Sequence, residues 1–552
     1  MIWNRAGRAQ SWTRLQAPWD VIVVGGGITG AGILDEASTL GFRTLLVEQQ
    51  DFASGTSSRS SKLVHGGLRY LKQGQIALAG VSVRERERLL KEAPGLVERL
   101  GFLASSRPEN GAWRHLFGAG LALYDLMGGR WAHHHYSASD FRWMAPHVSR
   151  RGLEGGFEYA DAVTDDARLV LRLILGGVAR GATALSYTCV ESLLRARGRV
   201  VGVALRDGLT GRRAEVRASV VINATGAWTD RLRSHLGKAP RVRPLRGSHL
   251  VFPAWRFPLP QAALFYHPRD RRPLFAVPWE GAVLVGTTDL DHEQSPEQAR
   301  ISESEVSYLM EALGAEFPAL ALEAGDAGTS FSGVRPVIGT GRVNPSAETR
   351  EHVLWDEAGL LTVAGGKLTT FRPTARAALR AVRRRLPTPQ PRTPASASAD
   401  PARDSAGDLL RGDVRRRLVG RYGPEAAHWF ASCRTDELER IPGTHTLWAE
   451  LRWAALAEGV AHLDDLLLRR TRLGLLLPQG GLRFESRIRA LCQPELGWDD
   501  ARWQRERQRY SALWQTSHAL PHVAATPCQS SVQDATGASP NDGQPAMGAV
   551  LR

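Results

Sequence analysis

Residues 20–48 read DVIVVGGGITGAGILDEASTLGFRTLLVE. The apolar run VIVV at 21–24 is typical of a buried strand, and a glycine-rich turn follows it directly. Residues 31–41 have a helical pattern, and a second apolar strand, TLLVE, ends at Glu48. A strand, a helix and a second strand in this order predict a βαβ unit with two parallel strands.

The glycines of the turn have the spacing GxGxxG at Gly25, Gly27 and Gly30. The first glycine allows a tight turn, the second lets a pyrophosphate approach the backbone, and the third packs the helix on the strand. The N-terminus of the helix would face the phosphates with its free N–H groups. Glu48 is placed to accept hydrogen bonds from a ribose diol, and its charge would repel the 2′-phosphate of NADP. The sequence therefore predicts a site for NAD or FAD.

Three further features favour FAD, because a fixed flavin needs contacts from several segments. Two more strands run into glycines, INATGAW at 222–228, which contains Gly226, and VAGGKLTTF at 363–371. The second is typical of a helix N-terminus directed at a flavin carbonyl, where it would stabilise the anionic reduced ring. The loop at 56–62 adds hydroxyls and a cation for the far end of the dinucleotide: Ser57, Ser58, Ser60, Ser61 and Lys62.

The pattern along the chain predicts an α/β protein. We expect an FAD-binding Rossmann-like domain of the glutathione-reductase type, a mixed α+β substrate or cap domain, and an all-α C-terminal domain. The expected boundaries are 1–17 for an N-terminal leader, 18–72, 151–230 and 335–386 for the FAD-binding domain, 73–150 and 231–334 for the cap domain, 387–407 for a linker, 408–515 for the helical domain and 516–552 for a disordered tail.

The 552 residues include 71 Lys and Arg against 56 Asp and Glu, a formal net charge of +15. Such a charge suits nucleic acid, an acidic membrane surface or an anionic substrate. A nucleic-acid module is disfavoured, because the sequence has no stacked-aromatic platform or zinc-finger spacing and its arginines are dispersed. Lysine is rare in this chain, so the lysine of GGKLTT, Lys367, suggests a position where a compact ammonium reaches a phosphate, with a surface lysine at a helix start as the alternative.

Four cysteines, Cys189, Cys433, Cys492 and Cys528, lie far apart without CxxC spacing, which argues against a disulfide framework and favours a reducing cytosol. No apolar run approaches the roughly 18 residues of a membrane-spanning helix. Contact with a membrane would therefore be peripheral. The leader, MIWNRAGRAQSWTRLQ, is expected to be a loose tail, with lipid contact through its two tryptophans as the alternative.

The cluster HHHY at 133–136 suggests a metal site at first sight. Adjacent histidines do not share one face of a strand or helix, and no cysteine or carboxylate cluster flanks them. We predict no metal.

The chain resembles the FAD-dependent sn-glycerol-3-phosphate dehydrogenases of the aerobic, respiratory type. The resemblance rests on stretches that run in family order from about residue 18 to residue 515: VIVVGGGITGAGI, TSSRSSKLVHGGLRYL, FEYADAVTDDARLV, INATGAW, GSHLVFP, GTTD, SGVRP, GGKLTTFR and HLDDLLLRRTRLGLLLP. The chain differs from the family pattern at Arg59, where a small residue is common, in its longer leader, and in the tail past residue 515.

The resemblance implies a site for each group of the reaction. Arg69, Tyr70, Arg335 and Lys367 would surround the phosphate and hydroxyls of the substrate, and His249 would lie near the reacting carbon. Gly365, Gly366 and Thr370 would lie against the flavin. His65 is either a flavin contact or a structural residue of its loop.

Oxidation of a secondary alcohol requires hydride transfer from C2 of the substrate to N5 of FAD while the hydroxyl proton leaves. A base with a pKa near neutrality would help, and His249 is the candidate. Arg335 is the alternative, because it would stabilise the developing alkoxide electrostatically.

The resemblance implies oxidation of glycerol 3-phosphate to dihydroxyacetone phosphate, with electrons passing to a membrane quinone. An oxidase that uses O₂ is the alternative. The implied location is cytoplasmic, on the inner face of the cell membrane, and the oligomeric state stays open, a homodimer included.

Overall fold

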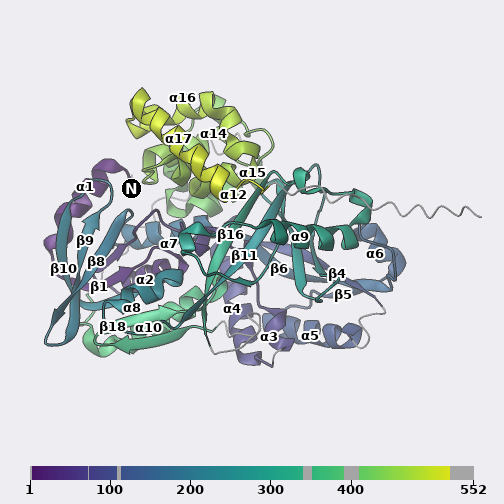
Figure 1. Ribbon diagram of the computed structural model, residues 1–552, viewed down its shortest axis with the longest axis horizontal. Coiled ribbons are helices and arrows are strands. Elements are labelled where there is room, and N and C mark those ends of the chain that lie inside the picture. The colour runs from purple at the N-terminus through teal and green to yellow at the C-terminus, as the bar shows by residue number, and fades with distance from the viewer. Residues whose placement is uncertain (1–2, 73, 108–112, 340–350, 391–409, 522–552) are drawn as a thin grey trace, which may run out of the picture.

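The computed structural model describes residues 3–72, 74–107, 113–339, 351–390 and 410–521 (Figure 1). It leaves aside the side chains of Arg5, Ala6, Arg69, Lys72 and Trp113. Two sheets lie side by side in Figure 1, and the C-terminal helices lie across one end of both.

The first sheet contains the βαβ unit that the sequence predicts. Its strands lie in the order β17-β18-β10-β1-β2-β7, and β10, β1, β2, β7 and β18 pair in parallel. The bounds are Trp19–Val24 for β1, Thr44–Val47 for β2, Thr183–Leu185 for β7, Arg213–Asn223 for β10, Val353–Glu357 for β17 and Leu360–Ala364 for β18. A hairpin of β8 (Thr188–Ala196) and β9 (Arg199–Asp207) extends from β10.

Three helices pack together against this sheet: α2 (Ile28–Thr39), α7 (Asp166–Ala179) and α10 (Phe371–Ala381). A short helix, α8 (Thr229–Ser234), follows β10. Strands β1 and β2 are almost entirely buried, as expected for parallel strands inside an α/β layer. The predicted Rossmann-like fold is confirmed.

The second sheet is mixed, and two of its strands contain the predicted site residues His249 and Arg335. Its main order is β15-β11-β14-β13-β12-β4-β6-β3, with β16 on β11 and β5 on β6. The bounds are Leu63–Val64 for β3, Val97–Ser106 for β4, His134–Ser137 for β5, Gly155–Thr164 for β6, Val242–Pro253 for β11, Ala262–Tyr266 for β12, Pro273–Trp279 for β13, Ala282–Gly286 for β14, Leu290–Asp291 for β15 and Thr329–Ile338 for β16.

The two faces of this sheet are covered by different elements, because side chains alternate along each strand. Leu250 and Phe252 of β11 pack with helix α9 (Glu303–Glu316), whereas Val251 packs with the C-terminal helices. Beside the sheet lie four more helices: α3 (Leu68–Lys72), α4 (Ile76–Glu92), α5 (Trp113–Gly128) and α6 (Ala138–Met144).

The C-terminal part is helical, as predicted. It comprises α12 (Gly412–Tyr422), α13 (Ala426–Ser432), α14 (Trp448–Ala457), a π-helical turn at Asp465–Arg470, α15 (Leu473–Leu476), α16 (Glu485–Leu496) and α17 (Asp500–Ser517). Among the residues described, no helix is long and apolar enough to cross a membrane.

Both ends of the chain differ from the sequence-based expectation. Trp3 and Trp12 are buried, and Trp3 stacks on Phe52 with 4.8 Å between ring centroids, so the leader is neither a loose tail nor a lipid contact through these rings. Helix α17 ends at Ser517, and the buried His518 contacts the carbonyl of Ser330 in β16 at 2.9 Å. Residues 516–521 therefore belong to the packed domain. The rest of the predicted tail, and residues 391–407 of the predicted linker, lie outside the described residues.

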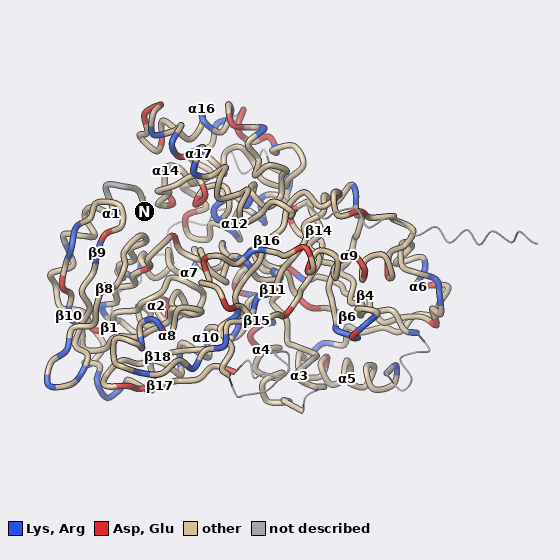
Figure 2. The backbone as a smooth tube through the Cα atoms, viewed as in Figure 1, with Lys and Arg blue, Asp and Glu red and all other residues tan. Residues whose placement is uncertain are grey.

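A buried group of charged side chains joins the C-terminal helices to the first sheet. We call it the ion-pair cluster; its members are Asp51, Lys62, Asp165, Asp166, Arg168, Arg421, Glu458, Arg469, Arg470 and Arg472. Elsewhere, as Figure 2 shows, acidic and basic residues are interspersed along the chain.

The pairs of this cluster connect segments hundreds of residues apart. Arg470 donates two hydrogen bonds to Asp51, of 2.7 and 2.8 Å, from the segment after α14 to the loop after β2. Arg472 donates to Asp166 at the start of α7 at 2.9 Å. Burial alone would raise the pKa of Asp165, but the nearby guanidiniums of Arg472, Arg421 and Arg168 outweigh it and lower the pKa to about 2.

We expect Arg472→Met to lower the free energy of unfolding by about 3–5 kcal/mol, because the buried Asp166 carboxylate loses one hydrogen bond and the positive charge that supplies it. Arg411→Met is the matched control, since its side chain is 85% exposed. Urea unfolding followed by tryptophan fluorescence measures the difference. Equal stability of the two variants would contradict a structural role for the cluster.

Candidate active site

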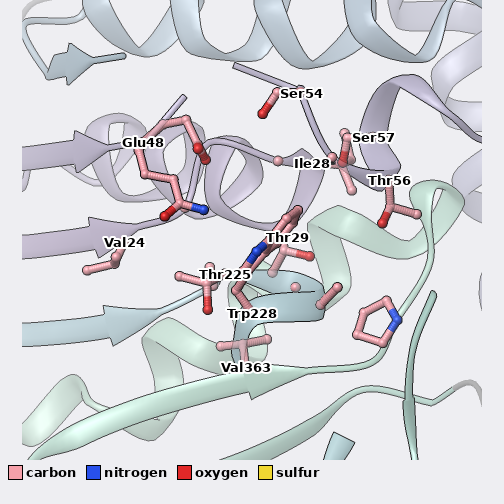
Figure 3. Close-up of a pocket in the computed structure, with 18 of the residues that line it drawn as sticks. Val24, Ile28, Thr29, Glu48, Ser54, Thr56, Ser57, Thr225, Trp228 and Val363 are labelled. Carbon is pink, nitrogen blue, oxygen red and sulfur yellow. Dashed lines mark hydrogen bonds between the residues drawn. The ribbon is translucent and has the colours of Figure 1, made fainter. Parts of the chain in front are cut away.

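A deep cavity opens where β1, β2, β10 and β18 end at the same edge of the first sheet (Figure 3). Its walls enclose about 1380 Å³, the open mouth included, which is more than a small metabolite needs. Glu48, Ser57 and Thr225 face it from three different segments. An open edge of this kind is where α/β sheets bind ligands.

The glycine turn has the geometry that its spacing predicts. Gly25 has a φ of +113°, and a Cβ there would lie 2.5 Å from the carbonyl oxygen of Ala224. A Cβ on Gly30 would overlap the carbonyl oxygen of Gly25, so the helix approaches the turn only because position 30 has no side chain. Gly27 is the N-cap of α2 and lines the cavity. The N-terminus of α2 therefore opens on the cavity, where a phosphate can approach the backbone of the glycine turn.

Glu48 lines the cavity at the end of β2, with its carboxylate fixed by backbone donors. It accepts hydrogen bonds from the N–H of Gly26 at 2.7 Å and of Gln50 at 2.9 Å. Burial raises the pKa of Glu48, and these two bonds oppose the shift. Each oxygen keeps a second lone pair, which is what a ribose diol would use.

The loop at 56–62 divides into two parts with different roles. Ser57 lines the cavity and its hydroxyl accepts from the N–H of Ile28 at 2.9 Å; Ser60 also lines the cavity. Ser58 and Lys62 are buried and are not among the lining residues. The Lys62 ammonium donates to the Ser58 carbonyl at 2.6 Å and to Asp166 at 2.9 Å. Where the sequence suggested a cofactor contact, Lys62 holds the loop in shape.

The other two glycine junctions also reach the cavity. Gly226, Gly365 and Gly366 line it, with φ values of +58°, +72° and +80°. Thr370 is buried at the N-cap of α10, and its N–H donates to the Lys367 carbonyl at 3.1 Å. It is not among the residues that line the cavity.

His249 lies in β11, buried between neighbouring strands and the loop at 56–62. Its Nε2 is 2.8 Å from the Ser61 hydroxyl, and its ring stacks on Phe331 with 4.6 Å between centroids. Its Nδ1 is buried and has no hydrogen-bond partner among the described residues. Burial, with the positive charges of Arg335 and Lys62, lowers the pKa of His249 well below its usual value. The imidazole is therefore neutral at pH 7, and its pKa is not the near-neutral one that the sequence suggested.

Arg335 lies in β16 beside Pro336, which lines the cavity. Its guanidinium contacts the buried carboxylate of Asp289 at 2.7 Å and the Thr287 hydroxyl at 3.1 Å. A Cβ on Gly247 of β11 would lie 2.6 Å from Arg335 Nη2, so this arginine can cross β11 only over a glycine.

Lys367 and Tyr70 meet although they are far apart in the sequence: the ammonium lies 4.1 Å from the centroid of the tyrosine ring. The His65 carbonyl accepts a hydrogen bond of 3.3 Å from Thr369, which joins the HGGLRY loop to GGKLTT. Lys367 lines the cavity. The backbone of Arg69 is in α3, but its side chain lies outside the described residues.

Comparisons with known proteins agree with this geometry. The family model for FAD dependent oxidoreductases matches residues 20–372, and the model for the C-terminal domain of alpha-glycerophosphate oxidase matches residues 393–503. The chain is 34% identical to glycerol-3-phosphate dehydrogenase 2 of Mycobacterium tuberculosis, over 92% of this chain and 90% of that protein. It belongs to the FAD-dependent glycerol-3-phosphate dehydrogenase family.

Other relatives fit the same assignment. The aerobic glycerol-3-phosphate dehydrogenase of Bacillus subtilis is 37% identical over 67% of each chain. The solved structure of the Bacillus halodurans glycerol-3-phosphate dehydrogenase complexed with FAD has a TM-score of 0.75 and 28% identity, covering 94% of this chain and 98% of that one. L-alpha-glycerophosphate oxidase of Mycoplasma pneumoniae shares the fold, with a TM-score of 0.56 and 18% identity over 69% of this chain and 98% of that chain.

FAD fits the cavity of this family member. The glycine turn and the N-terminus of α2 suit the pyrophosphate, Glu48 suits the ribose, and the left-handed glycines at 365 and 366 leave room for a flat ring against the backbone. The sequence analysis assigned no role to Asp166 or Asp289. Their motifs, VTDDARL and GTTD, were visible, but the partners of the two carboxylates are distant in sequence.

The histidine cluster does not form a metal centre in the described part of the chain. His133 Nδ1 contacts the Asp125 carboxylate at 2.7 Å, and no group of three or more His, Cys, Asp or Glu side chains in that part is placed to hold a metal ion.

We expect Gly30→Ala to abolish the retention of FAD, because the added methyl group overlaps the Gly25 carbonyl and displaces the helix that faces the pyrophosphate. Gly314→Ala in α9 is the control, since a Cβ there meets nothing within 4 Å. The ratio of flavin to protein absorbance after gel filtration measures retention. A yellow Gly30→Ala protein would refute this use of the turn.

Proposed function

We propose that the protein oxidises sn-glycerol 3-phosphate to dihydroxyacetone phosphate and passes the electrons to a membrane quinone. One observation carries this proposal. The cavity that fits FAD is lined by Lys367 and by Pro336, the strand neighbour of Arg335, so a phosphorylated substrate held by these two cations would lie next to a ring in that cavity.

The cations of this pocket suit a phosphate dianion. Charge-assisted hydrogen bonds contribute about 1.5–3 kcal/mol each, and a guanidinium fork with an ammonium supplies several. Lys367 lies between β18 of the first sheet and helix α10, at the N-cap of the short helical turn Leu368–Thr370, and Arg335 lies in β16 of the second sheet. The stacking of Tyr70 against the ammonium orients Lys367 without taking up its charge.

His249 is the proposed base. We propose that its Nδ1, which is buried and has no hydrogen-bond partner in the described structure, meets the hydroxyl group of the bound substrate. If the Ser61 hydroxyl donates to Nε2, the proton of the neutral ring is on Nδ1; if Nε2 donates to Ser61, Nδ1 is free to accept a proton. The second arrangement is the one a base needs. Bound FAD would accept the hydride from C2 at its N5 atom.

Arg335 would act beside His249. Its charge lowers the pKa of His249 and would equally favour an alkoxide over a hydroxyl nearby. The proton would therefore leave the substrate with help from a neutral acceptor and a fixed positive charge.

The electron acceptor distinguishes two candidate functions. The name aerobic glycerol-3-phosphate dehydrogenase, which relatives carry, is compatible with the quinone. A position on the inner face of the cell membrane and a homodimer belong to the same proposal. The family model named for alpha-glycerophosphate oxidase supports O₂ as the alternative. Stopped-flow reoxidation separates them: we expect the reduced enzyme to react rapidly with a quinone analogue and slowly with O₂. The opposite order would establish the oxidase.

Anaerobic titration of the yellow protein tests the substrate. We expect glycerol 3-phosphate to bleach the flavin absorbance, and glycerol to fail at the same concentration. A flavin that stays oxidised with glycerol 3-phosphate would exclude the proposed reaction.

We expect Lys367→Met to raise the KM for glycerol 3-phosphate by about 10- to 100-fold, because it removes one charge-assisted contact with the phosphate. The effect on glycerol oxidation should be small. Lys238→Met, at an exposed position, is the control. An unchanged preference for the phosphorylated substrate would contradict this assignment.

We expect His249→Gln to slow flavin reduction by about 10²- to 10⁴-fold while substrate affinity changes little. Because the pKa of His249 is lowered, its protonation removes the base only as the pH falls well below 6.5. The rate in the parent enzyme should therefore show no inflection from His249 between pH 6 and 8. Single-turnover mixing over a range of pH measures both the rate of flavin reduction and its pH dependence. Equal reduction rates in the variant and the parent would remove His249 as the base.

A further inference from the structure

The imidazole ring of His249 is held in one orientation by its neighbours in the second sheet. His249 pairs with Phe331 of β16 on one side and with Gly286 of β14 on the other. The ring stacks on Phe331 with 11° between the two planes, and a Cβ on Gly286 would lie 2.4 Å from the Cδ2 atom of His249. Because the ring lies against the phenylalanine and over a glycine, its two nitrogens have fixed directions.

The hydroxyl of Ser61 meets one of these nitrogens, with 2.8 Å between Oγ and Nε2 of His249. The residues on either side of Ser61 are both anchored on one buried carboxylate. Ser60 donates to Asp166 from its N–H at 3.0 Å and from its hydroxyl at 2.7 Å, and Lys62 donates to Asp166 at 2.9 Å. Lys62 also has a φ of +61°, a left-handed conformation that a lysine adopts only where its surroundings impose it. The backbone around Ser61 is therefore fixed, and its hydroxyl is held at Nε2.

The two nitrogens of His249 differ in what lies beyond them. Within the described chain, the Ser61 hydroxyl is the one hydrogen-bond partner of the ring, because Nδ1 is buried and has none. His249 is 2% exposed, whereas Ser61 is partly exposed. A proton that enters the ring at Nδ1 thus has one hydrogen-bonded route outward, from Nε2 to Ser61.

A protonated ring is unfavourable at this position. Burial removes the water that would solvate an imidazolium, and the positive charges of Arg335 and Lys62 face the ring; together they lower the pKa of His249 well below its usual value. A base that kept the proton of the substrate would become a third cation in this group. The ring avoids that charge if the proton on Nε2 leaves as another arrives at Nδ1.

We propose that Ser61 relays the proton of the reaction through His249. As the hydride leaves C2, the substrate hydroxyl gives its proton to Nδ1, Nε2 gives its proton to the Ser61 oxygen, and the Ser61 hydroxyl gives its own proton to a water molecule. Each bond to hydrogen that breaks is matched by one that forms, so one proton passes from substrate to solvent and the ring stays neutral.

The cycle closes after the product leaves, when Nδ1 exchanges its proton with water in the open site and Nε2 regains one through Ser61. Ser61 acts through His249 and positions its ring; it does not touch the reacting carbon. This inference rests on the proposed function, because the relay needs an alcohol substrate beside His249.

Single-turnover reduction of the holoprotein by glycerol 3-phosphate, without oxygen, tests the relay. Ser61→Ala removes only the hydroxyl, Ser61→Thr keeps one, and Ser304→Ala, at an exposed position of α9, is the matched control. We expect Ser61→Ala to slow flavin reduction by about 10- to 100-fold with little change in substrate affinity, and Ser61→Thr to stay within about threefold of the parent. The control should reduce at the rate of the parent.

Mixtures of light and heavy water separate a relay from a structural role of Ser61. A relay moves more than one proton in the same step, so the reduction rate of the parent should fall along a curve as the deuterium fraction rises, and that of Ser61→Ala along a straight line. A straight line in the parent overturns the relay, and so does a slowed Ser61→Ala that keeps the curvature of the parent. Ser61→Thr as slow as Ser61→Ala overturns it as well.

The tautomer of the resting protein gives a readout that needs no turnover. Nitrogen NMR of the holoprotein with isotope-labelled histidine, with the His249 signals assigned from the His249→Gln variant, should show a protonated Nε2 and an unprotonated Nδ1. The opposite tautomer overturns the relay. A parent whose flavin stays oxidised with glycerol 3-phosphate overturns the proposed function and the relay together, whereas rapid reduction at equal rates in the parent and Ser61→Ala overturns the relay alone.

Discussion

The Asp166 carboxylate is the point on which the site depends. It accepts hydrogen bonds from the backbone and hydroxyl of Ser60, from Lys62, from the N–H of Ala167 and from Arg472. These donors come from the cavity wall, from helix α7 and from the C-terminal domain. A buried carboxylate is costly unless every such bond is made, so the loop at 56–62 takes its shape only when the C-terminal arginines are in place. The helical domain therefore helps to build the cofactor cavity although, in the structure described, it does not line it.

Glycine residues determine the shape of the cavity, as the buried charges determine the conformation of the loop at 56–62 in its wall. At the ends of β1, β10 and β18 the chain turns through glycines with positive φ, Gly25, Gly226 and Gly365, and Gly30 allows α2 to approach the first of these turns closely. Gly247 extends the principle to the second sheet, where it leaves space for Arg335. The site is thus a set of backbone surfaces on which a few charged and aromatic groups are placed.

The sequence predicted what is local and missed what is distant. Strand, glycine turn and helix are adjacent in the chain, so the Rossmann-like sheet and the three glycine junctions could be recognised. A lysine in a serine-rich loop suits a phosphate or a buried carboxylate equally well, and the partner of Lys62 is more than a hundred residues away. The burial of Trp3 and Trp12, and the lowered pKa of His249, depend on packing between distant segments in the same way. Periodicity contains no information on such partners.

Helix α5 shows how one element can serve both the interior and the surface. Its inner residues hold the HGGLRY loop through Tyr124, and its outer residues keep an apolar stripe that folding alone does not require. Because this loop continues to Tyr70, and the Tyr70 ring lies against Lys367, the packing of α5 helps to fix the substrate end of the cavity.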